Sequence, residues 1–236
     1  RYLTHRSVAA FGLAAAVALL WSAPVKAAII VDTAFAEEAF TVSDSDLVNE
    51  DSSSFLSESV ANFDNTDPKN SRGDDWEKMN DGSFGAFGLP NDNSAAGDAI
   101  DGSWQLTYEL DTTAAPLGYD ITQIDSYSGW NRWWTSQQEY GILVRYVGEP
   151  TFQPLGEVSY TAGLTGLEEN ARRLSVTEDE TGVLASGVAA IRFDVTNTDP
   201  GYREFDVFGT ATVPEPATLA LLALGGLAAG RSRRRR

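Results

Sequence analysis

The stretch WQLTYEL, residues 104–110, alternates large apolar side chains with polar ones. Successive side chains of a β-strand point to opposite faces, whereas the apolar face of a helix repeats every three or four residues. The alternation therefore predicts a strand with one face in a core and the other face toward solvent. The residues expected to face the core are Trp104, Leu106, Tyr108 and Leu110.

The same period of two recurs in short pieces along the rest of the chain. Strands are predicted over residues 119–127, 140–146, 152–160, 172–177, 188–195 and 202–209, each bounded by Gly, Pro or acidic residues. Residues 40–42 and 55–56 could add edge strands. No stretch between the two ends of the chain keeps a helical period. Many short strands at this spacing predict an all-β fold, an antiparallel β-sandwich of the jelly-roll kind.

Residues 1–27 have the three parts of a secretory signal peptide. A basic start is followed by an apolar run over residues 8–21 and by a cleavage point after Ala27. A retained N-terminal anchor is the alternative, although this run is short for a membrane span, which needs about 20 residues. Residues 28–61 form an acidic, Ser-rich N-terminal segment, and residues 62–212 form the predicted sandwich domain.

Residues 213–236 combine three parts in a fixed order. Pro214-Glu215-Pro216 comes first, followed by an apolar run over 217–230 without a charge and then by five arginines. Prolines end a preceding helix or strand, the apolar run can enter a bilayer as a helix, and the arginines stay on the cytoplasmic side. At about 1.5 Å per residue the run spans about 21 Å, less than the bilayer core of about 30 Å. A segment this short suits a sorting signal that is read and then removed.

This order of parts resembles the PEP-CTERM sorting tail of Gram-negative bacteria, on Pro214, Glu215, Pro216, the Leu/Ala/Gly run and the terminal arginines. The resemblance implies transient anchoring in the inner membrane and recognition of the tripeptide by an exosortase-type membrane protease. It also implies export to the cell surface or extracellular matrix, in systems that accompany exopolysaccharide synthesis. An ordinary C-terminal anchor after a chance Pro-Glu-Pro is the alternative.

Charge and the rare residue types narrow the function. Residues 28–230 hold all 34 acidic residues but only nine of the 17 basic ones, so this part should repel nucleic acid and attract cations. The chain has no Cys, and its single His, His5, lies in the predicted signal peptide. Nucleophiles activated by His, and zinc held by His or Cys, are therefore excluded from the exported part. We expect a protein that is not an enzyme.

Carboxylate catalysis is the enzymatic alternative. Glycosidases use two carboxyl groups that flank the scissile bond, and acidic residues cluster at Glu168-Glu169 and at Glu178-Asp179-Glu180. Nothing in the sequence predicts a cleft between these clusters. A solvated acidic surface is the interpretation that we favour.

Three of the six tryptophans fall within residues 130–134, in the connection between two predicted strands. A strand cannot bury three rings so closely spaced on one face, so at least one ring should be at the surface. An exposed indole can stack on the apolar side of a sugar ring while neighbouring polar side chains hydrogen-bond the hydroxyl groups. Inward packing of the rings, as a cap on the core, is the alternative. The candidate ligand-binding residues are Trp130, Asn131, Arg132, Trp133, Trp134 and Gln137.

The order of the predicted strands is similar to that of the galactose-binding-like, discoidin-type domains. The similarity covers residues 62–210 and implies a jelly-roll sandwich; the bridging cysteines of that family are absent here. The pieces that carry it are the Trp104 strand, Ile121-Thr122-Gln123-Ile124, Trp130, the Tyr140–Tyr146 strand, Thr151–Leu155 and the Tyr202–Gly209 strand.

The same resemblance implies a structural Ca²⁺ site, formed in that family by a loop before the first core strand and a Glu on the last strand. The matching residues are Asn80 and Asp81, in a turn closed by Gly82, together with Glu204. Oxygen ligands, a Gly turn and an acidic domain suit Ca²⁺. The alternative is a plain turn and a surface Arg–Glu pair.

These features predict an exported, non-catalytic β-sandwich protein of the bacterial surface or extracellular matrix that binds exopolysaccharide. A purely structural matrix protein without a specific ligand is one alternative, and a carboxylate-based glycan-active enzyme is another.

Overall fold

The computed structural model describes residues 29–36, 39–62, 76–85, 103–129, 137–161, 171–196 and 201–213. The predicted signal peptide and the predicted membrane-sorting tail beyond Val213 lie outside the described residues. The described residues form nine strands and one short 3₁₀ helix. The elements are β1 (Ile29–Ala36), β2 (Phe55–Ala61), η1 (Trp76–Asn80), β3 (Trp104–Leu110), β4 (Tyr119–Ser128), β5 (Gln138–Tyr146), β6 (Gln153–Tyr160), β7 (Ala171–Glu178), β8 (Ala185–Val195) and β9 (Tyr202–Ala211).

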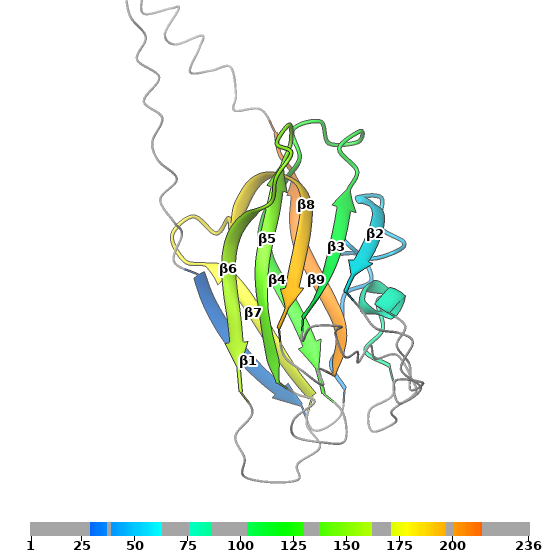
Figure 1. The fold of residues 1–236 in the computed structure, drawn as a ribbon, viewed down its shortest axis with the longest axis vertical. Helices are drawn as coiled ribbons and strands as arrows, with labels where there is room; N and C mark the ends of the chain where they lie inside the picture. Colours follow the sequence, from blue (N-terminus) through cyan, green and yellow to red (C-terminus); the bar gives the residue numbers. More distant parts are fainter. Residues whose placement is uncertain are drawn as a thin grey trace, which may run out of the picture.

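The strands lie in two antiparallel layers (Figure 1). The front layer of that view has the order β6-β5-β8-β3-β2, and the layer behind it has the order β1-β7-β4-β9. The two layers connect where the start of β4 pairs with the start of β8. The predicted antiparallel β-sandwich is confirmed, and β3 to β9 begin and end close to their predicted bounds.

The N-terminal segment differs from the expectation. We expected residues 28–61 to precede the sandwich, but β1 pairs with β7 and β2 pairs with β3, so the sheets begin at Ile29. Residues 55–56 do start an edge strand, whereas residues 40–42 form no strand. Phe40 instead packs against Phe84 and Tyr127, with ring centroids 6.2 and 5.7 Å apart. A short alternation of apolar residues can therefore also occur in a segment that forms no strand and packs on the sandwich through single side chains such as Phe40.

The chain reverses at two distinct ends of the sandwich. One, the loop end, holds Gly129, Gln137, Thr196 and Gly201; Gly129 N there donates to the Gly201 carbonyl over 3.0 Å. The other, the turn end, holds Gly118, Gly187 and Thr212. At the turn end Thr212 N donates to the Gly118 carbonyl over 2.8 Å, which fixes the last described residues beside the β3–β4 turn.

A cluster of buried aromatic rings joins the two layers. Phe193 on β8 stacks on Phe205 of β9 with ring centroids 4.3 Å apart, and Tyr202 stacks on the same Phe205 at 5.2 Å. The Tyr140 ring on β5 meets Phe205 edge-on at 5.7 Å. Phe205 therefore contacts rings from β5 and β8 of the opposite layer.

Replacing Phe205 with alanine should destabilise the fold strongly. The side chain is fully buried, and removing a buried aromatic ring costs about 3–5 kcal/mol. Chemical denaturation of the exported protein measures this loss. Leu56→Ala is the matched control, because Leu56 on β2 is 63% exposed. Equal losses in the two variants would contradict the assignment of Phe205 to the core.

Candidate functional site

The predicted ligand loop follows β4 and precedes β5, so both its ends lie at the loop end of the sandwich. Gln137 is described and is partly exposed directly before β5. The other five candidate residues lie outside the described residues, and their role stays a prediction: Trp130, Asn131, Arg132, Trp133 and Trp134.

Buried polar contacts hold the two ends of this connection. Ser126 Oγ on β4 donates to Gln138 Oε1 on β5 and shares a 2.6 Å hydrogen bond with the Tyr140 hydroxyl. Arg203 Nε on β9 donates to the Gly129 carbonyl over 2.8 Å. These four polar side chains are almost completely buried, so the loop leaves from and returns to a hydrogen-bonded frame.

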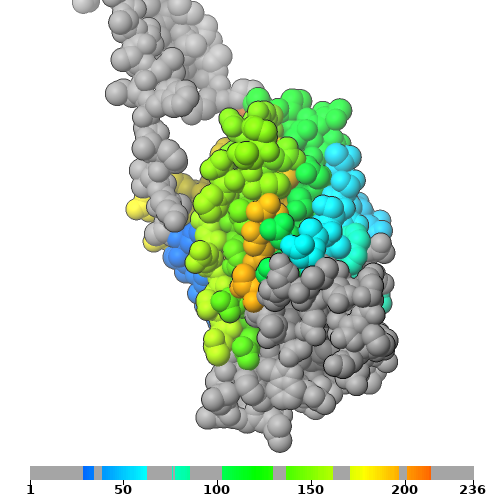
Figure 2. Space-filling model, in the orientation of Figure 1, coloured from blue at the N-terminus to red at the C-terminus, as the bar shows by residue number. Residues whose placement is uncertain are grey.

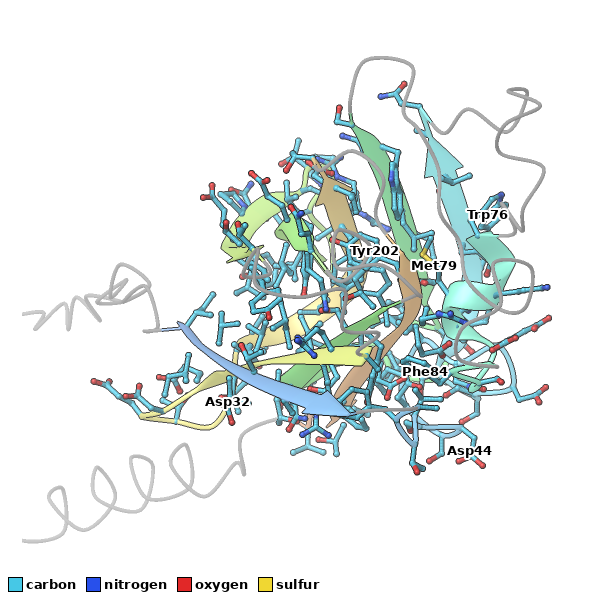
Figure 3. All side chains as sticks on the ribbon, turned by 90° about the horizontal axis from the view of Figure 1, so that it is seen from below. Asp32, Asp44, Trp76, Met79, Phe84 and Tyr202 are labelled. Carbon is cyan, nitrogen blue, oxygen red and sulfur yellow. The ribbon has the colours of Figure 1, made fainter. Side chains whose placement is uncertain are left out.

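Arg203 was not singled out from the sequence except as one half of a possible surface pair. Its guanidinium is fully buried and lies 5.3 Å from the centroid of the Phe84 ring. Its Nη1 also donates to the Phe84 carbonyl over 3.4 Å. Figure 3 views the sandwich from below and shows Phe84, Met79 and Asp44 on the same side of β9. Arg203 thus ties the end of β4 to the segment that holds the predicted calcium turn.

The structure brings two parts of the predicted calcium site together. Gly82 N donates to Glu204 Oε1 over 3.1 Å, and Glu204 is fully buried rather than at the surface. Gly82 has a φ of +72°, and a Cβ there would lie 2.8 Å from Asn49 Nδ2. Only glycine fits this turn without strain. Gly82 therefore allows the backbone of the turn to lie close enough to Glu204 for their hydrogen bond.

The other two predicted residues serve different purposes in the described structure. Asn80 is buried, and its Nδ2 donates to the Val48 carbonyl over 2.8 Å. Asp81 is exposed, and its Oδ1 accepts a hydrogen bond from Ser83 N over 2.9 Å. The Asp81 charge acts on Glu204 and raises its pKa, so Asp81 lies in the electrostatic range of that carboxyl. The part of Asn80 and Asp81 in a metal site stays a prediction.

Two further carboxylates lie in this region that the sequence did not single out. Asp46 Oδ1 accepts hydrogen bonds from Val48 N and Val207 N, each over 3.0 Å. Asp206 Oδ2 accepts from Ser43 N and from the Tyr127 hydroxyl, each over 2.9 Å. The second oxygen of each carboxylate, and likewise Glu204 Oε2, is buried with no hydrogen-bond partner among the described residues.

Burial without a compensating charge changes the acidity of these groups. Desolvation, together with the charge of the nearby Asp206, raises the pKa of Glu204 to about 10. Desolvation and the Asp46 charge raise the pKa of Asp206 to about 7, against hydrogen bonds that lower it. The pKa of Asp46 is also raised by burial. A bound cation would remove this penalty, because it supplies the missing opposite charge.

The carboxylates at this site are oxygen ligands, the type that a hard cation such as Ca²⁺ prefers. Within the described ranges, no group of three or more acidic, His or Cys side chains could hold a metal by side chains alone. Calcium also accepts backbone carbonyl oxygens and water. Glu204 Oε2 beside the turn of residues 80–82 would be the carboxylate ligand, with the turn supplying the neighbouring oxygens.

The acidic run at residues 178–180 is a turn rather than a pair of opposed carboxyls. The Glu178 carboxylate accepts hydrogen bonds from the backbone N–H groups of Glu180, Thr181 and Gly182. These bonds, with one from the Thr181 hydroxyl, lower the pKa of Glu178 to about 2. The carboxylate caps its own turn at the turn end of the sandwich. Glu168 and Glu169 lie outside the described residues.

None of the helical structure in the described part of the chain is long and apolar enough to cross a membrane. Residues 212–236 match the family model of the PEP-CTERM protein-sorting motif. The predicted sorting tail is thereby confirmed, and it indicates export with a membrane-anchored sorting signal. Among curated proteins, none matches this chain.

Several solved structures resemble the chain in strand arrangement. CpGH89CBM32-6, produced by Clostridium perfringens, is 14% identical with a TM-score of 0.42, over 70% of this chain and 98% of that one. The F5/8 type C domain of a Bacteroides fragilis protein is 15% identical with a TM-score of 0.41, and the match covers 67% of this chain and 97% of that domain. The C-terminal domain of a chitobiase from the same species is 13% identical with a TM-score of 0.42, and the match covers 67% of this chain and 94% of that domain. The chain is thus an antiparallel β-sandwich that carries a PEP-CTERM protein-sorting motif at residues 212–236.

Proposed function

We propose that this protein is exported, is processed at its sorting motif by an exosortase-type membrane protease, and displays a non-catalytic sandwich that binds polysaccharide outside the cell. The observation that carries the proposal is the combination of residues 212–236, which match the sorting motif, with a sandwich in front of them. The connection between β4 and β5, which contains the aromatic residues 130–134, has both of its ends at the loop end of that sandwich.

The proposed ligand contact rests on the frame described above. Ser126, Gln138 and Tyr140 fix the start of β5 to the end of β4, and Arg203 fixes the last residue before the aromatic stretch. Fixing both ends of a connection lowers the conformational entropy that the residues between them lose on binding. Stacking and a few hydrogen bonds without a deep pocket favour weak binding, which many copies in a matrix would strengthen by avidity.

We also propose a structural calcium ion at Glu204 and the turn of residues 80–82. The support is the buried Glu204 Oε2 without a partner among the described residues, beside two more carboxylates in the same condition. A cation there would stabilise residues 43–49, which cover one face of β9. This segment is hydrogen-bonded to β9 through Ser43 N and the Asp46 carboxylate. Its role would be structural, because the site lies under that segment.

The sorting motif can be tested by changing Pro214-Glu215-Pro216 to three alanines. The variant should remain unprocessed in the inner membrane, because the protease loses the tripeptide that it recognises. Immunoblots of membrane and surface fractions, with the mass of the product, measure this. Thr210→Ala, an exposed position before the motif, should be processed normally. Mature protein of normal mass at the surface in the triple variant would contradict the proposal.

The calcium site predicts a pH-dependent stability in the absence of metal. The pKa of Glu204 is about 10 in the folded protein against an ordinary value of 4.5, so the folded protein binds the Glu204 proton more tightly than the unfolded chain does. Its stabilising contribution is present below about pH 4.5 and is lost as pH rises toward about 10, by up to about 1.4 kcal/mol per pH unit. In chelator, the melting temperature should therefore fall between mildly acidic and alkaline pH.

Calcium at a hundredfold excess over Kd should restore about 2.7 kcal/mol at neutral pH. Glu204→Gln should remove both the pH dependence due to this carboxyl and the response to calcium, since it keeps the shape and removes the charge. Asp81→Ala should weaken the calcium response if Asp81 contributes a ligand. Glu149→Gln, an exposed carboxyl at the turn end, should retain both effects. Identical melting curves with calcium and with chelator in the unmodified protein would exclude the site.

The aromatic loop is tested by Trp130→Ala, Trp133→Ala and Trp134→Ala. Each exposed ring should be needed for polysaccharide binding, with a Kd near the millimolar end, about −4 kcal/mol, and its loss should change stability little. Migration in affinity gels and the melting temperature measure the two properties on the same variants. Trp104→Ala is the control for a buried ring and should lose about 3–5 kcal/mol of stability. If the three loop variants lose stability as Trp104→Ala does and none selectively loses binding, the loop is core and the protein is better described as a structural matrix protein.

A further inference from the structure

A hollow of about 660 Å³ lies over strands β5, β6 and β8, away from Glu204 and the turn of residues 80–82. Its lining includes Glu139 and Gly141 on β5, Glu157 on β6 and Asp194 on β8. Figure 2 shows these three strands side by side on the face turned to the viewer, with β5 and β6 in yellow-green and β8 in orange. The residues of β5 that face the core are Tyr140, Ile142 and Val144, so Glu139 and Gly141 face outward.

Gly141 is one of the residues that line this hollow. It pairs with Glu157 on one side and with Asp194 on the other, so two carboxylates flank a position without a side chain. Asp194 forms an ion pair with Arg192, whose Nε lies 2.8 Å from Asp194 Oδ1. No basic residue lines the hollow among the described residues. Because Arg192 neutralises Asp194, the negative charge of the hollow comes from Glu139 and Glu157.

Nothing in the described structure requires glycine at position 141. A glycine in the middle of a strand is destabilising relative to alanine, and it usually marks a bulge, a bend or a close approach by another molecule. Gly141 is not among the described glycines with positive φ. A Cβ there would meet its nearest neighbours, on Asp194 and Leu143, only at 3.8 Å, which is ordinary contact. By contrast, a Cβ at Gly156 on β6 would collide with the Ile29 side chain.

We propose that the hollow over Gly141 is a second carbohydrate subsite, which takes a glycan that carries protonated amino groups. The proposal rests on the proposed function in taking a glycan as the ligand. The missing side chain lets a flat sugar ring approach the β5 backbone. Glu157 and Glu139 then accept hydrogen bonds from ammonium and hydroxyl groups, and charge-assisted bonds of this kind are the stronger ones. An anionic polysaccharide would be repelled by the same carboxylates.

The probe is a hexamer of β-1,4-linked glucosamine, titrated calorimetrically into the exported protein at mildly acidic pH. Gly141→Ala should fold with an equal or higher melting temperature and bind the hexamer at least tenfold more weakly, because the methyl group occupies part of the hollow beside the β5 backbone. Glu157→Gln should weaken binding in the same direction without affecting stability. The N-acetylated hexamer of the same length should bind the unmodified protein more weakly than the glucosamine hexamer.

Two control variants separate the subsite from general effects. Gly209→Ala on β9, which does not line the hollow, should lower the melting temperature, since its methyl group would lie 2.3 Å from the Asp120 carbonyl oxygen. This variant shows what a packing glycine does in the same sandwich. Glu149→Gln, an exposed carboxyl at the turn end, should leave hexamer binding unchanged.

The outcomes distinguish failure of the subsite from failure of the proposed function. If glycans bind the unmodified protein and Gly141→Ala binds them equally well, the subsite is wrong while the proposed function stands. If no glycan binds the unmodified protein, both are wrong. A Lys-rich peptide that binds in a manner sensitive to Gly141→Ala, where the hexamer does not bind, would overturn the assignment to carbohydrate.

Discussion

The burial of β9 on both of its faces is the constraint on which the rest of the structure depends. One face places Phe205 and Val207 in the core between the layers. The other face places Glu204 and Asp206 under residues 43–49, so that carboxylates occupy a region that water cannot reach freely. Burying a charge is expensive unless it is paired. The same strand therefore contributes Phe205 to the aromatic core and buries two carboxylates that each have one oxygen without a hydrogen-bond partner among the described residues.

The elements that sequence reasoning predicted well are those whose two faces differ. In β3 the alternation of Trp104, Leu106 and Tyr108 with polar residues corresponds to alternating burial, and the strand was predicted at its observed bounds. In β9 the same alternation is present, but both faces are buried because the N-terminal segment covers the polar one. A local pattern reports which side chains share a face; it does not report what a segment about 160 residues away will place on that face.

The candidate site shows the same division. Glu204 and the turn ending in Gly82 were singled out together and do touch. Asp46 and Asp206 were missed, because Asp46 belongs to a Ser- and Asp-rich stretch that looks solvated. The apolar pair Leu47-Val48 directly after Asp46 could have indicated that this stretch is covered, because two adjacent apolar residues are unusual in a solvated loop. Both side chains are buried in the structure. The role of Arg203 had no local signal, since its partners Gly129 and Phe84 are fixed only by the fold.

The path of β9 also sets the distance between the two ends of the sandwich. Its ten residues run from Tyr202 at the loop end to Ala211 at the turn end, about 33 Å at about 3.3 Å per residue. The described chain therefore leaves the sandwich at the turn end, opposite the loop end. Over such a distance salt screens charge interactions almost completely, since the Debye length is about 8 Å. A charge at the loop end therefore has little influence on what approaches the chain at the turn end, and the two ends of the sandwich can meet different surroundings independently.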